Sequence, residues 1–295
     1  MRNGACMKIL LLGGKGFVGS AMTKLYPHNF VIADKNNIPP IDLTGDISGV
    51  FTRDIDVVIH LADINPHSKC AISMDACDFY SNNVLSTLNV IKCLKQFKIK
   101  HIIYLSTSHV YGCGLDFGES SPLNPPNYYV DTKICCENII RDYCKDSNTV
   151  YQILRVSSVS GALNDKFRTK SICAEDHLIA NLIKNNINGG NTVVYNPGII
   201  RDYIHIKDLC KCINACAVSD KSGVYNVGSG VATSVRILTS TIQKQMGYIN
   251  TIYRNSQVKM LLNTISNNLF LATFDVSLDY TLDDIIKDTI SFYQK

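Results

Sequence analysis

Short apolar runs alternate with longer segments of helical periodicity along most of this chain. Ile9 to Leu12 and Ile55 to Ala62 are almost continuously apolar, which is typical of strands buried on both faces of a parallel sheet. Apolar residues at i, i+4 and i+7 spacing follow Asn83, and a second helix of this character is predicted from Tyr129 to Tyr143. The alternation of strands and helices predicts an α/β fold.

The rest of the pattern predicts further elements of both kinds. Strands are expected at Phe30–Ala33, just before Asp46, from His101 onward and at Val150–Val156, with an extended segment at Thr192–Tyr195 and a turn at 196–198. Phe17–Leu25 is expected to be the start of an apolar-faced helix. Further helices are expected at Leu178–Ile187, Ser234–Met246 and Tyr280–Tyr293, and a polar loop at Ala162–Glu175.

One turn between a predicted strand and a predicted helix is rich in glycine. Gly13, Gly16 and Gly19 follow Leu12 at three-residue spacing. Such glycines allow a tight turn and a close approach of the backbone to a pyrophosphate, whose charge is favoured at the amino terminus of the helix. Strand, glycine turn and helix together predict a dinucleotide-binding, doubly wound parallel sheet. Alone, a glycine triplet is a weak signal, because glycines also mark ordinary turns.

Asp34 directly follows the second predicted strand. A carboxylate at this place can accept both ribose hydroxyls of NAD and would repel the additional phosphate of NADP. Lys35 beside it partly offsets that repulsion. We therefore expect NAD as the cofactor in preference to NADP.

Composition narrows the class of protein. The 295 residues can bury a sizeable core, and 46% apolar with 18% charged residues is ordinary for a globular protein. The net charge of +4 is small and no run of Lys or Arg predicts a nucleic-acid groove. No stretch approaches the ~20 apolar residues of a membrane span, and Ile9 to Leu12 is too short for the core of a signal peptide. We expect a cytoplasmic protein.

The 12 cysteines do not have the spacing of a metal site, since no Cys-x-x-Cys pair occurs. Cys135, Cys136, Cys210 and Cys212 lie in predicted helices. We expect reduced thiols that pack as small apolar side chains, and no bound metal.

Candidate chemistry follows the strand that begins at His101. It ends in a hydroxyl-rich loop containing Thr107, and Tyr129 and Lys133 stand four residues apart, on one face of the predicted helix. A phenol with a pKa of ~10 is a poor base at neutral pH. A lysine ammonium ~4 Å away contributes roughly 4 kcal/mol at an effective dielectric of about 20, which would bring the pKa of Tyr129 to about 7. Tyr128 has no such partner, because Thr132 stands four residues after it.

With these motifs in this order, the chain resembles the extended short-chain dehydrogenase/reductases, the family of NAD-dependent nucleotide-sugar epimerases and dehydratases. The matching pieces cover most of residues 8 to 230: GGKGFVG, Asp34, Gly45-Asp46-Ile47, HLA (60–62), Asn82-Asn83-Val84, STSHVYG (106–112), YxxxK (129–133), Leu154-Arg155, RDYIHIKDL (201–209) and YNVGSG (225–230). RDYIHI makes the chain most similar to the UDP-glucose 4-epimerases of that family.

The resemblance implies a set of site residues. Its cofactor contacts would be Gly13, Gly16, Phe17, Val18, Gly19, Asp34, Asp46, Ile47, Leu61, Ala62, Asn83, Tyr129, Lys133 and Val156. Its catalytic residues would be Thr107, Tyr129 and Lys133, and its substrate contacts Ser108, His109, Ser158, Arg201 and Lys259.

Several of these residues have a simpler interpretation. Asp46 would reach the adenine amino group or serve only as a turn aspartate. The Thr107 hydroxyl would bridge the sugar oxygen and the tyrosine or satisfy backbone at the end of the strand. Arg201 would clamp the nucleotide diphosphate or form a surface ion pair with Asp202 or Asp208. Where the family usually has asparagine and tyrosine, this chain has Ser158 and Ser160.

The resemblance also implies an activity: 4-epimerisation of a nucleotide hexose through a transient 4-keto intermediate. Dehydratases of the family carry an Asp-Glu pair after the threonine; Ser108-His109 stands there instead, which disfavours dehydration. The same catalytic set would serve an NAD(P)H-dependent reductase of nucleotide 4-keto-(6-deoxy)sugars. An alternative of another class is a catalytically silent NAD-binding sensor or scaffold.

The expected partners are a nucleotide-diphosphate sugar and a second copy of the chain. The helices Asn83–Lys95 and Tyr129–Tyr143 have apolar outer faces that would pair in a homodimer, although core packing within one subunit accounts for the same pattern. We expect residues 1–160, with a return near 199–218, to form the NAD-binding domain. Residues 161–295 would form a smaller, interwoven α/β domain for the substrate.

Overall fold

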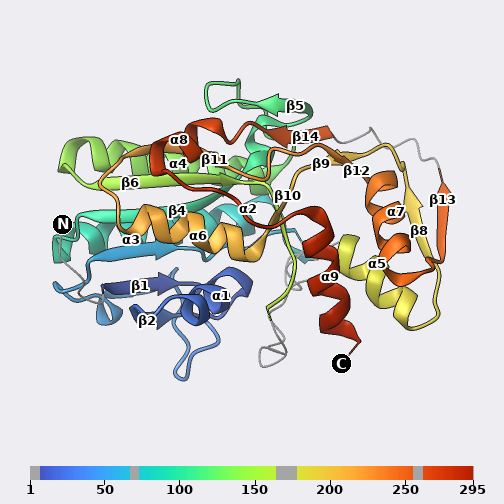
Figure 1. Ribbon diagram of the computed structural model, residues 1–295. Coiled ribbons are helices and arrows are strands. Elements are labelled where there is room, and N and C mark those ends of the chain that lie inside the picture. The colour runs from blue at the N-terminus through green and yellow to red at the C-terminus, as the bar shows by residue number, and fades with distance from the viewer. Residues whose placement is uncertain (1–6, 67–72, 164–177, 255–261, 295) are drawn as a thin grey trace.

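The computed structural model describes residues 7–66, 73–163, 178–254 and 262–294. Its largest sheet has six parallel strands in the order β11–β6–β4–β3–β1–β2 (Figure 1). These strands are β1 (Lys8–Leu12), β2 (Asn29–Ala33), β3 (Val57–His60), β4 (His101–Thr107), β6 (Val150–Val156) and β11 (Gly223–Val227). The chain runs from β1 to β2 on one side and returns to β3 on the other. Ligands bind at such a reversal, outside the carboxyl ends of the strands.

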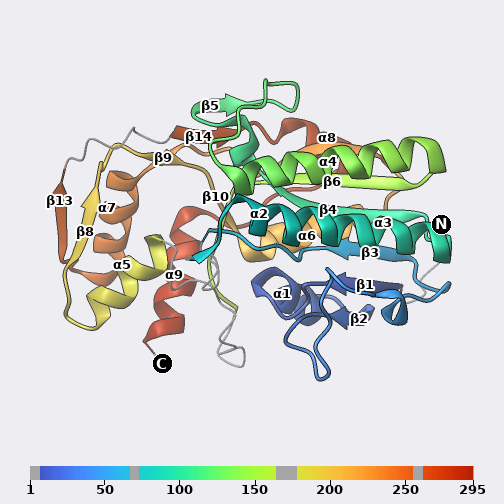
Figure 2. The same ribbon diagram turned by 180° about the vertical axis from the view of Figure 1, so that it is seen from behind.

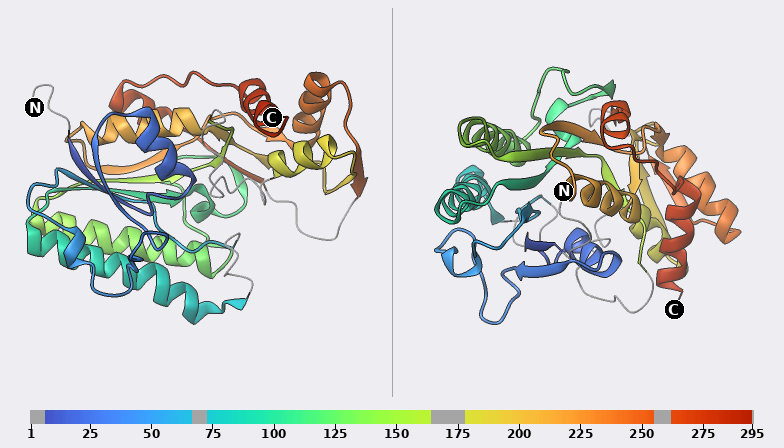
Figure 3. Two further views of the ribbon diagram at one scale, coloured as in Figure 1. Left: turned by 90° about the horizontal axis from the view of Figure 1, so that it is seen from below. Right: turned by 60° about the vertical axis from the view of Figure 1, so that its left-hand side comes forward.

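Helices cover both faces of this sheet, as a doubly wound fold requires. On one face, α1 (Phe17–Leu25) and α6 (Ile206–Ala217) share a core with Ile9 and Leu11. On the other, α3 (Leu85–Phe97) and α4 (Tyr128–Ser147) share a core with Leu10 and Leu12. Alternate residues of one strand point to opposite faces, so a continuous apolar run is needed to fill both cores. Figure 3 shows the two helical layers on either side of the sheet.

The helix expected from Asn83 begins earlier than its apolar pattern. It starts as α2 (Ala76–Phe79), where Asp75 and Asp78 form a reciprocal capping box, and passes through the π-helical turn η3 (Tyr80–Val84) into α3. The polar residues of the first turns conceal this start from a search for apolar periodicity. The π turn carries Asn83, and such turns inside helices are frequent at functional sites.

A second group of helices has a core of its own. Side chains of α5 (Leu178–Ile187), α7 (Val235–Met246) and α9 (Leu282–Tyr293) pack together. Figures 1 and 2 show this group beyond one end of the large sheet, beside the pair of β8 (Thr192–Tyr195) and β13 (Thr251–Arg254). No helix in the described part of the chain is long and apolar enough to cross a membrane.

Short strands connect the two groups. β5 (Gly114–Phe117), β14 (Leu262–Ile265), β9 (Ile200–Arg201) and β12 (Thr233–Ser234) form a four-stranded sheet, and β7 (Ser158–Ser160) pairs with β10 (Tyr203–His205). α8 (Asn268–Phe274) packs beside β11, with Phe270 against Tyr225. The large sheet and the helices that cover it therefore include residues 223–227 and 268–274 as well as 206–217.

One predicted strand is wrong. No strand lies between β2 and Asp46: residues 43–45 form a turn and bend, and the third strand of the sheet along the chain is β3. Asp42 and Asp46 each accept a hydrogen bond from the backbone two residues on, which favours turns over pairing in a sheet. Most of the loop predicted at 162–175, from residue 164 on, lies outside the described residues.

Candidate active site

The glycine turn joins β1 to α1 at the reversal in strand order. Gly13 has a φ of +80°, and a side chain there would also meet the Ala62 backbone at 2.8 Å. A side chain on Gly19 would meet the Gly14 backbone at 2.5 Å, so only glycine lets α1 pack this closely on the turn. Gly16 is the N-cap of α1, where no side chain accepts a hydrogen bond from the first turn. The free N–H groups of Phe17 and Val18 suit a diphosphate.

The end of β2 brings Asp34 to this turn. The buried carboxylate accepts hydrogen bonds from the Lys15 backbone N–H at 3.0 Å and from the backbone and side-chain N–H groups of Asn36, each at 2.9 Å. An ionised carboxylate has about four acceptor sites, so about one stays available. Asp34 therefore fits a ribose beside the turn, with one hydrogen bond to offer rather than the two expected.

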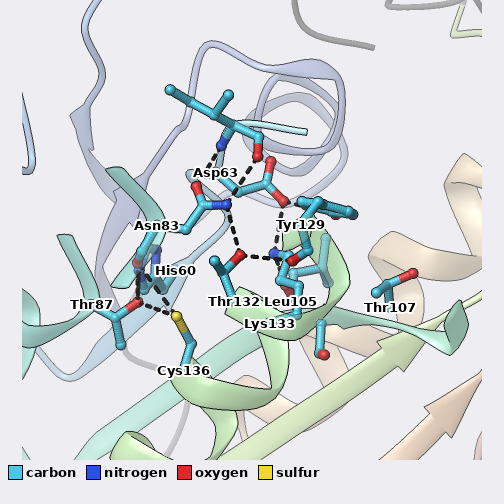
Figure 4. Close-up of polar contacts among 12 residues, drawn as sticks. His60, Asp63, Asn83, Thr87, Leu105, Thr107, Tyr129, Thr132, Lys133 and Cys136 are labelled. Atoms are coloured by element: carbon cyan, nitrogen blue, oxygen red, sulfur yellow. Dashed lines mark hydrogen bonds and ion pairs between the residues drawn. The ribbon is translucent and has the colours of Figure 1, made fainter. Parts of the chain in front are cut away.

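Tyr129 and Lys133 lie together at the carboxyl ends of β3 and β4, and Asp63 lies between them (Figure 4). The Lys133 ammonium is within 2.7 Å of Asp63 Oδ2 and donates to the Leu105 carbonyl at 2.8 Å. The Tyr129 hydroxyl donates to the same Asp63 oxygen at 3.1 Å. Lys133 is only 3% exposed and lies 5.8 Å from the centre of the Tyr129 ring. The predicted pair therefore exists, with a carboxylate as its third member.

This carboxylate overturns the expected pKa of Tyr129. Burial, together with the charge of Asp63 and its hydrogen bond to the phenol, raises the pKa of Tyr129 well above its ordinary value. The prediction of a pKa near neutrality counted Lys133, with a further contribution from the positive nicotinamide, and did not include Asp63. In the structure the positive charge of Lys133 is compensated by Asp63 at shorter range.

Asn83 fixes the loop that carries Asp63. Its side-chain oxygen accepts from the Ile64 N–H at 2.8 Å, and its amide donates to the Ile64 carbonyl at 3.0 Å and to Thr132 Oγ1 at 3.1 Å. The resemblance implies a cofactor contact for Asn83. The observed bonds make it a clamp between the π turn, the loop after β3 and α4.

Thr107 ends β4 beside this cluster, with no hydrogen bond drawn to it in Figure 4. Its hydroxyl accepts from the His109 backbone N–H at 3.3 Å, which is the simpler role considered for it, and still has its own proton to donate. The next residue, Ser108, is buried and donates to Asn263 Oδ1 at 2.6 Å, which ties the loop to β14. Its side chain is thus used within the protein, and the neighbouring His109 is half-buried.

The other predicted cofactor contacts divide into two groups. Leu61 and Ala62 follow β3 beside the glycine turn, and Val156 ends β6 opposite Thr107. Ile47 is buried in the core shared with α3 and α4. Asp46 is exposed and accepts from the Ser48 backbone N–H at 2.9 Å, as a turn aspartate does.

The predicted substrate contacts lie in the short strands. Arg201 ends β9, half-buried, and Ser158 begins β7. Among the described residues, neither Asp202 nor Asp208 forms an ion pair with Arg201; the two carboxylates accept hydrogen bonds from other groups. The simpler interpretation of Arg201 therefore lacks support. Lys259 lies outside the described residues.

A buried ion pair fixes α4, the helix that carries Tyr129 and Lys133, on the large sheet. Arg155 on β6 binds Glu137 on α4 at 2.7 Å, Ser106 on β4 donates to the same carboxylate at 2.5 Å, and Arg155 also donates to the Tyr111 hydroxyl at 2.9 Å. These bonds fix α4 on the sheet and thereby fix Tyr129 and Lys133 over the strand ends. The sequence motif contained Arg155 but gave no indication of its partner.

Asp63 is the functional candidate that sequence reasoning missed. A signal for it was present, since it directly follows the HLA motif at the end of a buried strand, on the edge where ligands bind. A search for charged residues after each buried strand would have found it.

The residues present fit NAD. The uncapped amino terminus of α1, the Gly13 backbone and the Asp34 carboxylate lie along one edge of the sheet, and the packing of Ala62 on Gly13 connects this edge to the loop of Asp63 and Tyr129. Diphosphate, ribose and reacting group thus have complementary groups in the expected order. Among the described residues, no cluster of His, Cys, Asp or Glu has the arrangement of a metal site.

Comparison with known proteins agrees with this arrangement. Residues 9–228 match the NAD dependent epimerase/dehydratase family. A UDP-glucose 4-epimerase from Lactobacillus helveticus is 26% identical over 82% of this chain and 82% of its own length. One from Halalkalibacterium halodurans is 28% identical over 82% of this chain and 81% of its own.

Comparison of the fold with solved structures also finds a UDP-glucose 4-epimerase. The crystal structure of a UDP-glucose 4-epimerase from Thermotoga maritima, with UDP-glucose, superposes with a TM-score of 0.84 over 98% of this chain and 99% of that chain. Their sequences are 19% identical, so this likeness concerns the fold.

Proposed function

The chain belongs to the NAD-dependent epimerase/dehydratase family, and on this premise we propose that it interconverts the C4 epimers of a nucleotide-diphosphate hexose. The protein is an NAD-dependent enzyme of that family. The observation that carries the finer proposal is the buried Tyr129–Lys133 pair at the strand ends, beside a turn built for a dinucleotide. The names of the related sequences support 4-epimerisation in particular.

We propose that the glycine turn holds the diphosphate of NAD and that Asp34 holds its adenosine ribose. Lys133, with three donors and two of them used, has a donor left for the nicotinamide ribose. Bound there, NAD would supply the acceptor for a hydride from the sugar carbon and the donor for its return. Tyr129 exchanges the proton of the sugar hydroxyl, and Thr107 orients that hydroxyl from the end of β4.

The proposed product follows from the geometry of a ketone. Oxidation of the C4 alcohol gives a planar carbon, which can take the hydride back on either face. Return on the opposite face inverts the centre and leaves a proton to be restored to the oxygen by the same tyrosine. The enzyme would thus need no second acid or base, in keeping with Ser108-His109 after Thr107.

We propose that the diphosphate of the substrate meets Arg201, on the strand β9 that faces β14. A guanidinium binds a diphosphate through two parallel hydrogen bonds, and Arg201 has no ion pair with either neighbouring aspartate among the described residues. Residues 161–295 would supply most of the sugar and nucleotide contacts.

Incubation of the purified protein with UDP-, GDP-, CDP- and dTDP-hexoses tests the proposal, with products identified by NMR and mass spectrometry. An epimerase yields the C4 epimer of one of these sugars without net consumption of NAD. A reductase instead consumes NADH or NADPH in proportion to a 4-keto substrate. If NAD binds but neither reaction occurs, the result favours the alternative of a catalytically silent NAD-binding sensor or scaffold.

A further inference from the structure

One carboxylate oxygen serves both members of the proposed catalytic pair. Asp63 Oδ2 accepts the hydrogen of the Tyr129 hydroxyl at 3.1 Å and lies 2.7 Å from the Lys133 ammonium (Figure 4). Asp63 follows β3, Tyr129 and Lys133 belong to α4, and the Asn83 clamp on Ile64 fixes the loop between them. The contact therefore joins two elements that Asn83 also links, through Ile64 of the loop and Thr132 of α4.

Of the titratable groups around this contact, only Asp63 and Lys133 contribute a charge. On β3, burial lowers the pKa of His60 to about 3, so His60 is neutral above that pH. On β4 and α4, burial raises the pKa of Tyr104 and of Cys136, so both are neutral at physiological pH. Asp63 and Lys133 thus neutralise each other. A phenolate at Tyr129 would add a second negative charge that no described neighbour balances.

Given the proposed function, on which this inference rests, we propose that Asp63 takes the phenolic proton of Tyr129 while Tyr129 takes the proton of the sugar hydroxyl. The sugar O–H bond breaks and its proton moves to Tyr129 Oη; the Tyr129 O–H bond breaks and its proton moves to Asp63 Oδ2. The alcohol carbon is oxidised to a ketone as its hydride passes to the nicotinamide dinucleotide, which is reduced. Each transfer reverses when the hydride returns.

In this scheme Tyr129 passes a proton on without becoming a phenolate. Asp63 acts through the tyrosine, so it is a positioning residue that also stores the proton. Its charge is balanced by Lys133 before the step, and Lys133 also donates to the Leu105 carbonyl at 2.8 Å.

The first test measures Tyr129 directly and needs no substrate. The chain has 15 tyrosines and no tryptophan, so tyrosinate absorbance rises without indole overlap, and subtracting the curve of Tyr129→Phe isolates Tyr129. In the wild type we expect Tyr129 to ionise above the ~10 of free tyrosine. In Asp63→Asn, where Lys133 stays, its ionisation should move down by at least one pH unit. An unchanged curve overturns the inference.

The second test is the pH dependence of kcat/KM. If Asp63 takes the proton, the rising limb of the wild type lies well below the Tyr129 ionisation. In Asp63→Asn the tyrosine has to ionise, so the limb moves up until it coincides with the tyrosinate curve. A wild-type limb that coincides with the tyrosinate curve overturns the inference, as does a limb that moves down in the variant. The wild-type comparison decides even if Asp63→Asn does not fold.

A matched control exists on the same helix. Asp131 of α4 accepts a hydrogen bond from the Tyr80 hydroxyl, which raises the pKa of Tyr80 to about 12. Asp131→Asn should lower the Tyr80 ionisation and leave the rising limb in place. A limb that moves equally in Asp131→Asn overturns the inference. Failure of the proposed function is distinct: no nucleotide sugar is converted, while the Tyr129 ionisation still depends on Asp63.

Discussion

Tyr129 is the residue on which the proposed chemistry depends most directly. Its hydroxyl lies over the ends of β3 and β4, and its ring is positioned by α4, which the Arg155–Glu137 pair fixes on the sheet. The glycine turn and Asp34, which suit the cofactor, belong to different elements. Loss of the phenol should therefore separate the chemical step from cofactor binding.

We expect Tyr129→Phe to lower kcat by at least 10²-fold, within the range of contributions from general acid–base catalysis, with the Kd of NAD changed less than threefold. Steady-state kinetics and NAD titration measure the two quantities. Tyr128→Phe is the control, because Tyr128 is 60% exposed and has Thr132 rather than lysine one turn on. A dead Tyr128→Phe beside an active Tyr129→Phe would show that the other tyrosine faces the substrate.

Asp34 gives a second prediction at this scale. Its carboxylate would meet the 2′-phosphate of NADP with like charge, and with about one acceptor site left its selectivity rests more on that charge than on hydrogen bonds. Asp34→Ala should weaken NAD binding and strengthen NADP binding, so that the ratio of their Kd values shifts by at least tenfold. Calorimetric titration with both cofactors measures the ratio, and an equal loss for both would contradict the assignment.

Among the elements, the turn between β1 and α1 is the most constrained by shape. A Cβ on Gly19 would lie 2.5 Å from the Gly14 Cα and 2.7 Å from its carbonyl carbon, both backbone atoms that cannot rotate away. Gly19→Ala should push α1 off the turn and cost about 1 to 3 kcal/mol of unfolding free energy, as overpacking typically does. It should also raise the Kd of NAD, because the amino terminus of α1 moves with it.

Gly49→Ala is the matched control for that substitution. A Cβ at Gly49 would meet nothing within 4 Å, so this variant should be neutral or gain up to about 1 kcal/mol from the stiffer unfolded chain. Urea unfolding of both variants gives the comparison. Equal stability of Gly19→Ala and Gly49→Ala would mean that the turn relaxes around a methyl group.

Elements defined by local pattern were predictable from sequence, and those defined by distant pairing were not. The predicted bounds of β6, α5 and β8 agree with the structure, because each is an apolar run or stripe complete within its own residues. β14 pairs with β5 through Asn263 and Gly114. Neither segment has a periodicity of apolar residues that predicts a strand. Local pattern carries no information on a partner so far along the chain.

The site divides in the same way. The glycine turn, Asp34, Tyr129 and Lys133 belong to motifs with fixed spacing, and the structure brings them to one edge of the sheet. The role of Ser108 was set by Asn263, far along the chain, and the pKa of Tyr129 by a carboxylate on another element. Spacing predicts which residues meet on one helix, and only packing decides which charge lies between them.

The whole molecule leaves one helical layer open to a partner. α3 and α4 lie side by side on one face of the large sheet (Figure 2), with their inner residues, such as Val90 and Ile140, in the core. On the outer side Leu85 and Leu88 are 38% and 39% exposed. Core packing thus accounts for part of the apolar pattern of α3. It does not account for these two leucines, which are on the outer side.

We therefore predict a homodimer in which α3 and α4 of two copies form a four-helix contact around a two-fold axis. In such a contact the same patch of both copies takes part, and each pair of contacting residues occurs twice. One substitution therefore alters the interface at two places. Leu88→Glu should raise the dimer dissociation constant at least tenfold, because two carboxylates would be buried without partners. Leu269→Glu is the control: Leu269 is 48% exposed on α8, which packs on the opposite face. Sedimentation at micromolar concentration measures both variants, and a monomeric wild type would refute the dimer.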